Sequence, residues 1–203
     1  SSTTGASLVW AYKDLVKVDP PNASFDEVMR AAASVEPGAD GLCFLPYLAG
    51  ERSPYWLDEI KGGFYGLRLT HDSRHLIRAI MEGIAFSLRH LIDISREVGV
   101  PITELALAGG GTKTPGLCQI IADVCGLNAD IYTESETVTR VLYALCETAV
   151  SGASFDLALT GTFPSPERVI CDPELCSRYD AVYASYRRFA AFALGEATQN
   201  TQR

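Results

Sequence analysis

The stretch "GGFYGLRLTHDSRHLIRAIMEGIAF", residues 62–86, combines a short strand pattern, a polar capping site and the start of a long helix. "FYGLRL" predicts a strand with an internal glycine. Asp72 or Ser73 is suited to cap a helix over residues 74–98, because apolar residues then recur on one helical face. Gly99 is the natural end of this helix, which we expect to be the longest in the chain.

A second stretch, "ALAGGGTKTPGLCQIIADV" at residues 106–124, has the order strand, glycine turn, helix. Such a turn exposes backbone N–H groups beside a helix N-terminus, and glycines let an anion approach closely. The named phosphate motifs do not match, because no glycine directly precedes Lys113 and Thr114 replaces the last glycine of G-x-G-x-x-G. These residues alone leave both a phosphate-binding loop and a plain turn open.

The rest of the chain alternates predicted strands and helices, which indicates the α/β class. Ser24 followed by Glu27 forms a capping-box pattern that opens a helix over residues 25–35. Further helices are expected over residues 5–17, 115–126, 138–150 and 178–195, and strands over 42–48, 103–109 and 129–133. Residues 161–175 are rich in turn formers and predict a loop.

The composition of the chain argues against some classes of binding partner. The 203 residues carry a formal net charge of −8 with no basic run, which disfavours nucleic acid or an anionic membrane as the main partner. No apolar stretch has the length of a membrane helix, and no secretory leader is visible. The six cysteines lack the spacing of a disulfide framework, which favours a reducing cytoplasm. The opening "SSTTGASLVW" has no initiator methionine, so we expect the chain to be part of a longer protein.

Two residue pairs have spacings found in metal sites. His71 and His75 are four residues apart near a helix start, but no third ligand is nearby in the sequence. Cys171 and Cys176 are similarly isolated. We therefore predict no metal site in the protein, and keep an unrelated α/β metal-dependent enzyme as an alternative.

Four segments together resemble the FGGY carbohydrate kinases, the family of glycerol, xylulose and gluconate kinases. Residues 62–86 are similar to the second signature segment of that family, with its spacing from Gly62 to Glu82. "LPYLAGERSPYW" looks like the loop before this signature, "LAGGGTKTPGLCQIIADVCG" like the adenosine-binding motif, and "GASLVW" like another nucleotide-contacting element. The four segments occur in the family's order over about 150 residues.

This resemblance implies an actin-like ATPase (ribonuclease H-like) fold within the α/β class, with two lobes and a cleft between them for ATP and sugar. Residues 1–203 would form the C-terminal, nucleotide-binding lobe. The implied activity is transfer of the γ-phosphate of ATP, with Mg²⁺, to a hydroxyl of a sugar, sugar acid or polyol. The implied partners are the small carbohydrate and the protein's own N-terminal lobe. A homodimer is a further candidate assembly.

The resemblance also implies site residues. Gly110 and Gly111 would line the adenosine and α-phosphate side of the cleft, with Thr112 and Lys113 beside them and Gly5 on the opposite wall. The general base and the sugar-binding residues belong to the N-terminal lobe, so no catalytic residue is assigned here. For Glu82, orienting a loop or packing the helix is favoured over contact with substrate, and Arg52 and Ser53 are candidates either for reaching the cleft or for anchoring their own loop.

The sequence departs from the family pattern in two places. "TVTRVLYALCE" at residues 137–147 has bulky Thr139, Arg140 and Tyr143 where the family has small residues that pack close to the cleft. Pro115 and Val9 stand where glycerol kinases carry polar nucleotide contacts. We therefore keep a second hypothesis, a degenerate, non-catalytic kinase lobe with an assembly or regulatory role.

Overall fold

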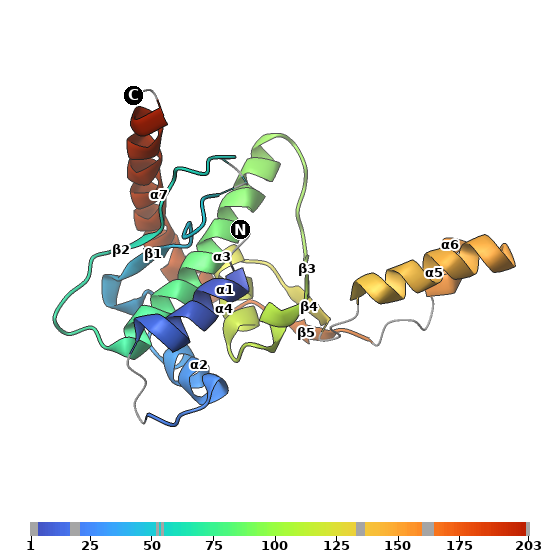
Figure 1. Ribbon diagram of the computed structural model, residues 1–203, viewed down its shortest axis with the longest axis horizontal. Helices are drawn as coiled ribbons and strands as arrows, with labels where there is room; N and C mark the ends of the chain where they lie inside the picture. Colours follow the sequence, from blue (N-terminus) through green and yellow to red (C-terminus); the bar gives the residue numbers. More distant parts are fainter. Residues whose placement is uncertain are drawn as a thin grey trace.

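The computed structural model describes residues 4–16, 21–51, 53, 55–132, 137–159 and 165–201. Its centre is helix α3 (Ser73–Glu97), which crosses the molecule obliquely (Figure 1). The elements in direct contact with α3 include α1 (Thr4–Trp10), α2 (Phe25–Ala33), the 3₁₀ helix η2 (Ala39–Gly41), β1 (Cys43–Leu45), α4 (Leu117–Cys125) and α7 (Pro173–Thr201). Helices thus cluster with short strands around one helix, and the expected α/β class is confirmed.

The boundaries of α3 agree with the capping pattern in the sequence. The Asp72 carboxylate accepts hydrogen bonds from the N–H groups of Arg74 (3.0 Å) and His75 (3.3 Å), two of the donors that a helix start leaves without partners. At the other end the chain leaves the helix through Gly99, which has a φ of 83°. The expected helix over 74–98 is confirmed, but the expectation that it is the longest is wrong, because α7 has 29 residues and α3 has 25.

Replacing Asp72 with alanine is expected to lower the free energy of unfolding by about 1 kcal/mol, because the first turn of α3 loses its cap. Asp72→Asn should cost less, since an amide oxygen still accepts from the same N–H groups. Urea denaturation of the three proteins checks this order, and equal stability of all three would contradict the capping role.

The strands form two small sheets. In one, β1 pairs antiparallel with β2 (Gly63–Tyr65). In the other, β3 (Leu105–Ala108) pairs parallel with β4 (Ala129–Tyr132), which pairs antiparallel with β5 (Glu167–Val169). β1 is shorter than expected because Pro46 directly follows it, and proline has no N–H to continue a ladder. β5 lies in a segment expected to be a loop, so that expectation is wrong.

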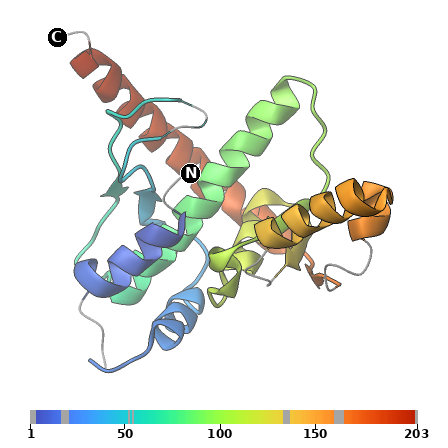
Figure 2. The same ribbon diagram turned by 45° about the vertical axis from the view of Figure 1, so that its right-hand side comes forward.

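Outside the elements around α3, two helices form a separate pair, and short helical segments follow α1 and β3. α5 (Thr137–Ser151) packs mainly on α6 (Phe155–Leu159), and the two extend to one side, away from α1 and α3 (Figures 1 and 2). Near the N-terminus, α1 continues into a short π-helix, η1 (Ala11–Leu15), and β3 is followed by a 3₁₀ turn, η3 (Gly110–Lys113). None of the helices in the described ranges is both long enough and apolar enough to cross a membrane.

Aromatic side chains join α3 to α7. The ring of Phe86 on α3 lies 5.4–5.9 Å, between centroids, from the rings of Tyr179, Tyr183 and Tyr186 on α7. Phe86, Tyr179 and Tyr186 are almost fully buried. These contacts fix the long C-terminal helix on the central helix, and they explain why the tyrosine-rich segment is buried on one side only.

Candidate functional site

The predicted site residues come from two elements that are in contact. Gly5 lies in α1, and Gly110, Gly111, Thr112 and Lys113 make up η3, which follows strand β3. α1 packs against both α3 and η3. The structure therefore brings together two segments that are widely separated in the sequence.

The turn after β3 is held by its own hydrogen bonds. Gly109 has a φ of 95°, which side chains rarely tolerate, and it lets the chain turn sharply at the end of the strand. The Gly109 carbonyl accepts from the Thr112 N–H (3.1 Å) and the Thr112 hydroxyl (2.8 Å). The Thr114 N–H in turn donates to the Gly111 carbonyl (3.1 Å). The backbone of η3 is thus fixed without any ligand.

Glycine at positions 5, 110 and 111 is not explained by packing against the described residues. Their backbones do not have the positive φ that favours glycine, and a Cβ atom at each would meet no described atom within 4 Å. The contrast is Gly62, where a Cβ would lie 2.7 Å from the Leu45 carbonyl oxygen. The described residues would accept a side chain at the three positions, so these glycines leave space that a molecule from outside the chain can enter.

The two polar members of η3 differ in their surroundings. Thr112 is half-buried, and its hydroxyl donates within the turn. Lys113 is exposed, and its side chain makes no hydrogen bond or ion pair with any residue in the described part of the chain. Its ammonium group is therefore free to meet a negative charge at the outer side of the glycine turn.

A cavity of about 240 Å³ lies on the inner side of η3. Gly111 and Thr112 form one wall, and apolar side chains of α3, β3 and α4 form the others. Two polar members of the lining are Ser87 and Cys118, and burial raises the pKa of the Cys118 thiol. No sequence motif marks these two residues, and neither is among the site residues expected from the sequence.

The positions that depart from the family pattern are placed as follows. Val9 is 43% exposed on α1, the helix that also carries Gly5. Pro115 is half-buried and precedes Gly116, whose missing Cβ lets the turn approach Ala33 of α2. The bulky residues near 140 were expected close to the cleft, but Tyr143 is 61% exposed on α5, which packs mainly on α6. In this structure α5 does not crowd α1 or η3.

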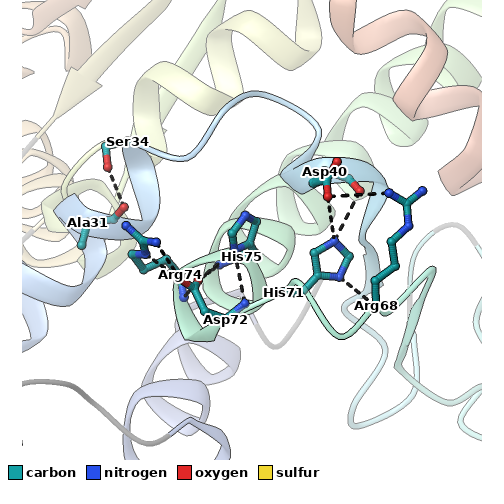
Figure 3. Close-up of polar contacts among 8 residues, drawn as sticks. All are labelled: Ala31, Ser34, Asp40, Arg68, His71, Asp72, Arg74 and His75. Carbon is teal, nitrogen blue, oxygen red and sulfur yellow. Dashed lines mark hydrogen bonds and ion pairs between the residues drawn. The ribbon is translucent and has the colours of Figure 1, made fainter.

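His71 and His75, the two histidines with the spacing of a metal site, have structural partners (Figure 3). The Arg68 N–H donates to His71 Nδ1 (3.0 Å), so the proton of the neutral ring is on Nε2, which points to the Asp40 carbonyl oxygen at 3.3 Å. His75 Nδ1 lies 2.8 Å from the Asp72 carboxylate at the start of α3. Within the described residues no three His, Cys, Asp or Glu side chains are grouped so that they could hold a metal ion.

Glu82 is a buried structural residue. It is 1% exposed, and its Oε1 accepts hydrogen bonds from the Gly38 N–H (2.9 Å), Arg78 Nε (2.7 Å) and the Tyr179 hydroxyl (3.1 Å). Burial raises the pKa of this carboxyl, while Arg78 opposes the shift. Glu82 thus ties α3 to α7 and to the loop after α2, in line with the packing role favoured from the sequence.

The loop between β1 and β2 is anchored to itself. Glu51 and Leu57 pair through two backbone hydrogen bonds (3.0 and 2.7 Å), and the Ser53 N–H donates to the Glu51 carboxylate (3.1 Å). Ser53 therefore has the anchoring role in this structure, while Arg52 lies outside the described residues.

Comparison with known proteins identifies the family of this chain. The profile of the C-terminal domain of the FGGY family of carbohydrate kinases matches residues 1–140. The chain belongs to this family. The xylulose kinase of Lactococcus lactis subsp. lactis is 31% identical over 189 residues, or 91% of this chain and 36% of that protein. The xylulose kinase of Bacillus subtilis is 38% identical over 120 residues, or 59% of this chain and 23% of that protein.

Solved structures of this family have the same fold. The crystal structure of xylulose kinase from Rhodospirillum rubrum superposes with a TM-score of 0.78 at 27% identity, covering 96% of this chain and 39% of that one. The expected actin-like ATPase fold is thereby confirmed, and the chain corresponds to the C-terminal domain of such a kinase. It spans between 23% and 39% of the length of these three relatives. Membership of the FGGY family excludes the alternative of an unrelated metal-dependent enzyme.

Proposed function

We propose that residues 1–203 form the C-terminal, nucleotide-binding lobe of an ATP-dependent carbohydrate kinase. The whole kinase would transfer the γ-phosphate of ATP to a hydroxyl of a sugar, sugar acid or polyol. The observation that carries the proposal is the open space at Gly5, Gly110 and Gly111, on two elements that touch each other. A nucleotide lying between α1 and η3 would supply the neighbour that makes small residues necessary there.

Each site residue then has a physical role. The backbone at Gly110 and Gly111 would face the adenosine and the α-phosphate, and Gly5 would form the opposite wall. Thr112 and Lys113 border the same turn, where the lysine charge would offset phosphate charge. Mg²⁺ would accompany the ATP and would offset phosphate charge, and no residue of this chain is assigned to hold it. We assign no catalytic base to this chain, because it would lie in the N-terminal lobe, and we expect this chain alone to be inactive.

The proposed partners follow from the same assignment. They are ATP, a small carbohydrate and the N-terminal lobe of the kinase, with a homodimer as a candidate assembly. The xylulose kinases among its relatives make a ketose a reasonable first substrate to test. With a net charge of −8 we propose no nucleic-acid or membrane partner, and a cytoplasmic location.

Gly111→Trp is expected to abolish nucleotide binding, because an indole at this position would fill the space proposed for the adenosine. Isothermal titration with MgATP is made first on this chain and then on the full kinase that contains it, where affinity should fall at least about a hundredfold. A Cβ at residue 111 meets no atom of the described residues within 4 Å, so the backbone there can carry a side chain. An unchanged melting temperature would separate lost binding from misfolding.

Gly195→Trp is the matched control, because a Cβ at Gly195 on α7 also meets open space. It should leave binding unchanged. If both variants bind MgATP like the wild type, the nucleotide does not lie on the glycine turn. If the wild-type full kinase binds no MgATP at all, the degenerate, non-catalytic lobe becomes the better hypothesis.

A further inference from the structure

The first turn of α7 is capped in a way that brings two cysteines together. Asp172 directly precedes the helix, and its carboxylate accepts from the Glu174 N–H at 2.8 Å, while its carbonyl accepts from the Cys176 N–H at 2.9 Å. Asp172 is therefore the N-cap, Cys171 the residue before the cap, and Cys176 the fourth residue of the helix. Apolar side chains at these two positions pack on each other in the hydrophobic staple that often closes a helix start. Here both members of the staple are thiols.

Contacts with other elements place both cysteines beside the end of α4. The Cys171 N–H donates to the Asn128 side chain (3.2 Å), which holds the backbone of Cys171 beside the end of α4. A Cβ on Gly126, the residue that ends α4, would lie 3.9 Å from Cys176 Sγ. Cys176 and Cys171 also interact directly through their side chains, and this contact is one of the causes that raise the pKa of Cys176. Both thiols are free and half-buried, so a small reagent can reach them.

We propose that Cys171 and Cys176 form a dithiol modification site that peroxides oxidise to a reversible intramolecular disulfide. The thiolate of one cysteine attacks a peroxide oxygen, which breaks the O–O bond and, with hydrogen peroxide, leaves a sulfenic acid and one water molecule. The second thiol then displaces the sulfenic oxygen as a second water molecule, and the S–S bond forms. Two thiols and one peroxide thus become one disulfide and two waters.

The other four cysteines lack this arrangement. Cys43, Cys118 and Cys125 are buried, and Cys146 is exposed on α5. Cys125 is the alternative partner for Cys176, but it is only 6% exposed and burial raises its pKa to about 12. Burial also raises the pKa of Cys176, so its thiol is not unusually reactive. Cys171 and Cys176 are distinguished from the other cysteines because they can form a disulfide with each other.

The disulfide would join the first turn of α7 covalently to the residue before its N-cap. Tyr179 lies three residues after Cys176 on the same helix and donates to Glu82 of α3. A bond between Cys171 and Cys176 would therefore hold the first turn of α7 in the position from which it contacts the central helix. We expect oxidation to raise the melting temperature by about 5 °C, with reversal by a reducing agent.

Peptide mapping tests the proposal directly on the wild-type protein. The folded protein is treated with hydrogen peroxide, quenched with N-ethylmaleimide and digested with trypsin without reduction. Cleavage after Arg168 and Arg178 gives one peptide that contains Cys171 and Cys176 and no other cysteine. The expected product is this peptide with no maleimide, lighter by the mass of two hydrogen atoms, and able to take two labels after reduction.

Two results would overturn the proposal. One is a peptide that still carries two maleimide labels under conditions that oxidise Cys146. The other is a cross-link from Cys176 to the peptide that contains Cys125. Cys176→Ser keeps a side chain of similar shape but should lose both the disulfide and the rise in melting temperature. Cys146→Ser, the matched control on an exposed cysteine, should keep both.

Discussion

Glu82→Ala is expected to lower the free energy of unfolding by about 3–5 kcal/mol. The side chain is 1% exposed, and the guanidinium of Arg78 that it pairs with is also buried. Without the carboxylate, Arg78 would keep its charge, with the Ala33 carbonyl and the Tyr179 hydroxyl as its remaining hydrogen-bond partners among the described residues. The Gly38 N–H would lose its acceptor at the same time. Urea denaturation of the variant measures the combined loss.

Asp26→Ala is the control for this experiment. Asp26 and Arg30 also form an ion pair four residues apart on one helix, but their side chains are 56% and 63% exposed. Such a pair is screened by water, and its loss should cost less than about 0.5 kcal/mol. A similar small effect for Glu82→Ala would show that water or a local rearrangement compensates Arg78, against the buried network described above.

The starts of α2 and α3 could be read from the sequence because their signals are local. Ser24 and Glu27 form the expected capping box, with the Ser24 N–H donating to the Glu27 carboxylate at 2.7 Å. Asp72 caps α3 in the same way, through side-chain oxygens that lie two or three residues from the N–H groups they bind. Chemistry contained within four residues needs no tertiary information, so these boundaries were predicted well.

The missed elements depend on partners that are distant in the sequence. β5 has three residues and no alternating pattern, and it forms because Val169 lies opposite Ala129 of β4. Arg168 adds an ion pair with Asp130 on β4 and another with Glu104 next to β3. Unlike β5, the start of α7 has a local signal. The helix begins at Pro173 rather than at the expected residue 178, because proline is well suited to the first position of a helix.

The candidate site could be predicted from the sequence only through the family resemblance. A strand followed by glycines gave the turn at Gly109, but nothing near that turn shows that α1 packs against it. That contact depends on how α1 and η3 are both placed on α3 and β3. The lack of a packing reason for glycine at positions 5, 110 and 111 also became visible only with the surrounding atoms in place.

Gly83→Ala is expected to lower the free energy of unfolding by about 3 kcal/mol. Gly83 faces β1 from the middle of α3, and a Cβ there would overlap the Phe44 carbonyl oxygen and lie 3.3 Å from the Phe44 ring. The clash is with backbone, so rotation of a side chain cannot relieve it. β1 is also held by its pairing with β2, so the helix and the strand would have to separate. Chemical denaturation should therefore show a lower midpoint.

Gly195→Ala is the control for Gly83→Ala, because the two variants are expected to change stability in opposite directions. Gly195 lies within helix α7, and an added Cβ would meet no atom within 4 Å. Alanine is favoured over glycine inside a helix, so this variant should be more stable than the wild type by about 0.5–1 kcal/mol. The same preference acts at Gly83, where the clash with β1 must exceed it. If Gly83→Ala were also stabilising, α3 and β1 could not be in the close contact that positions the helix bearing Arg78 and Glu82.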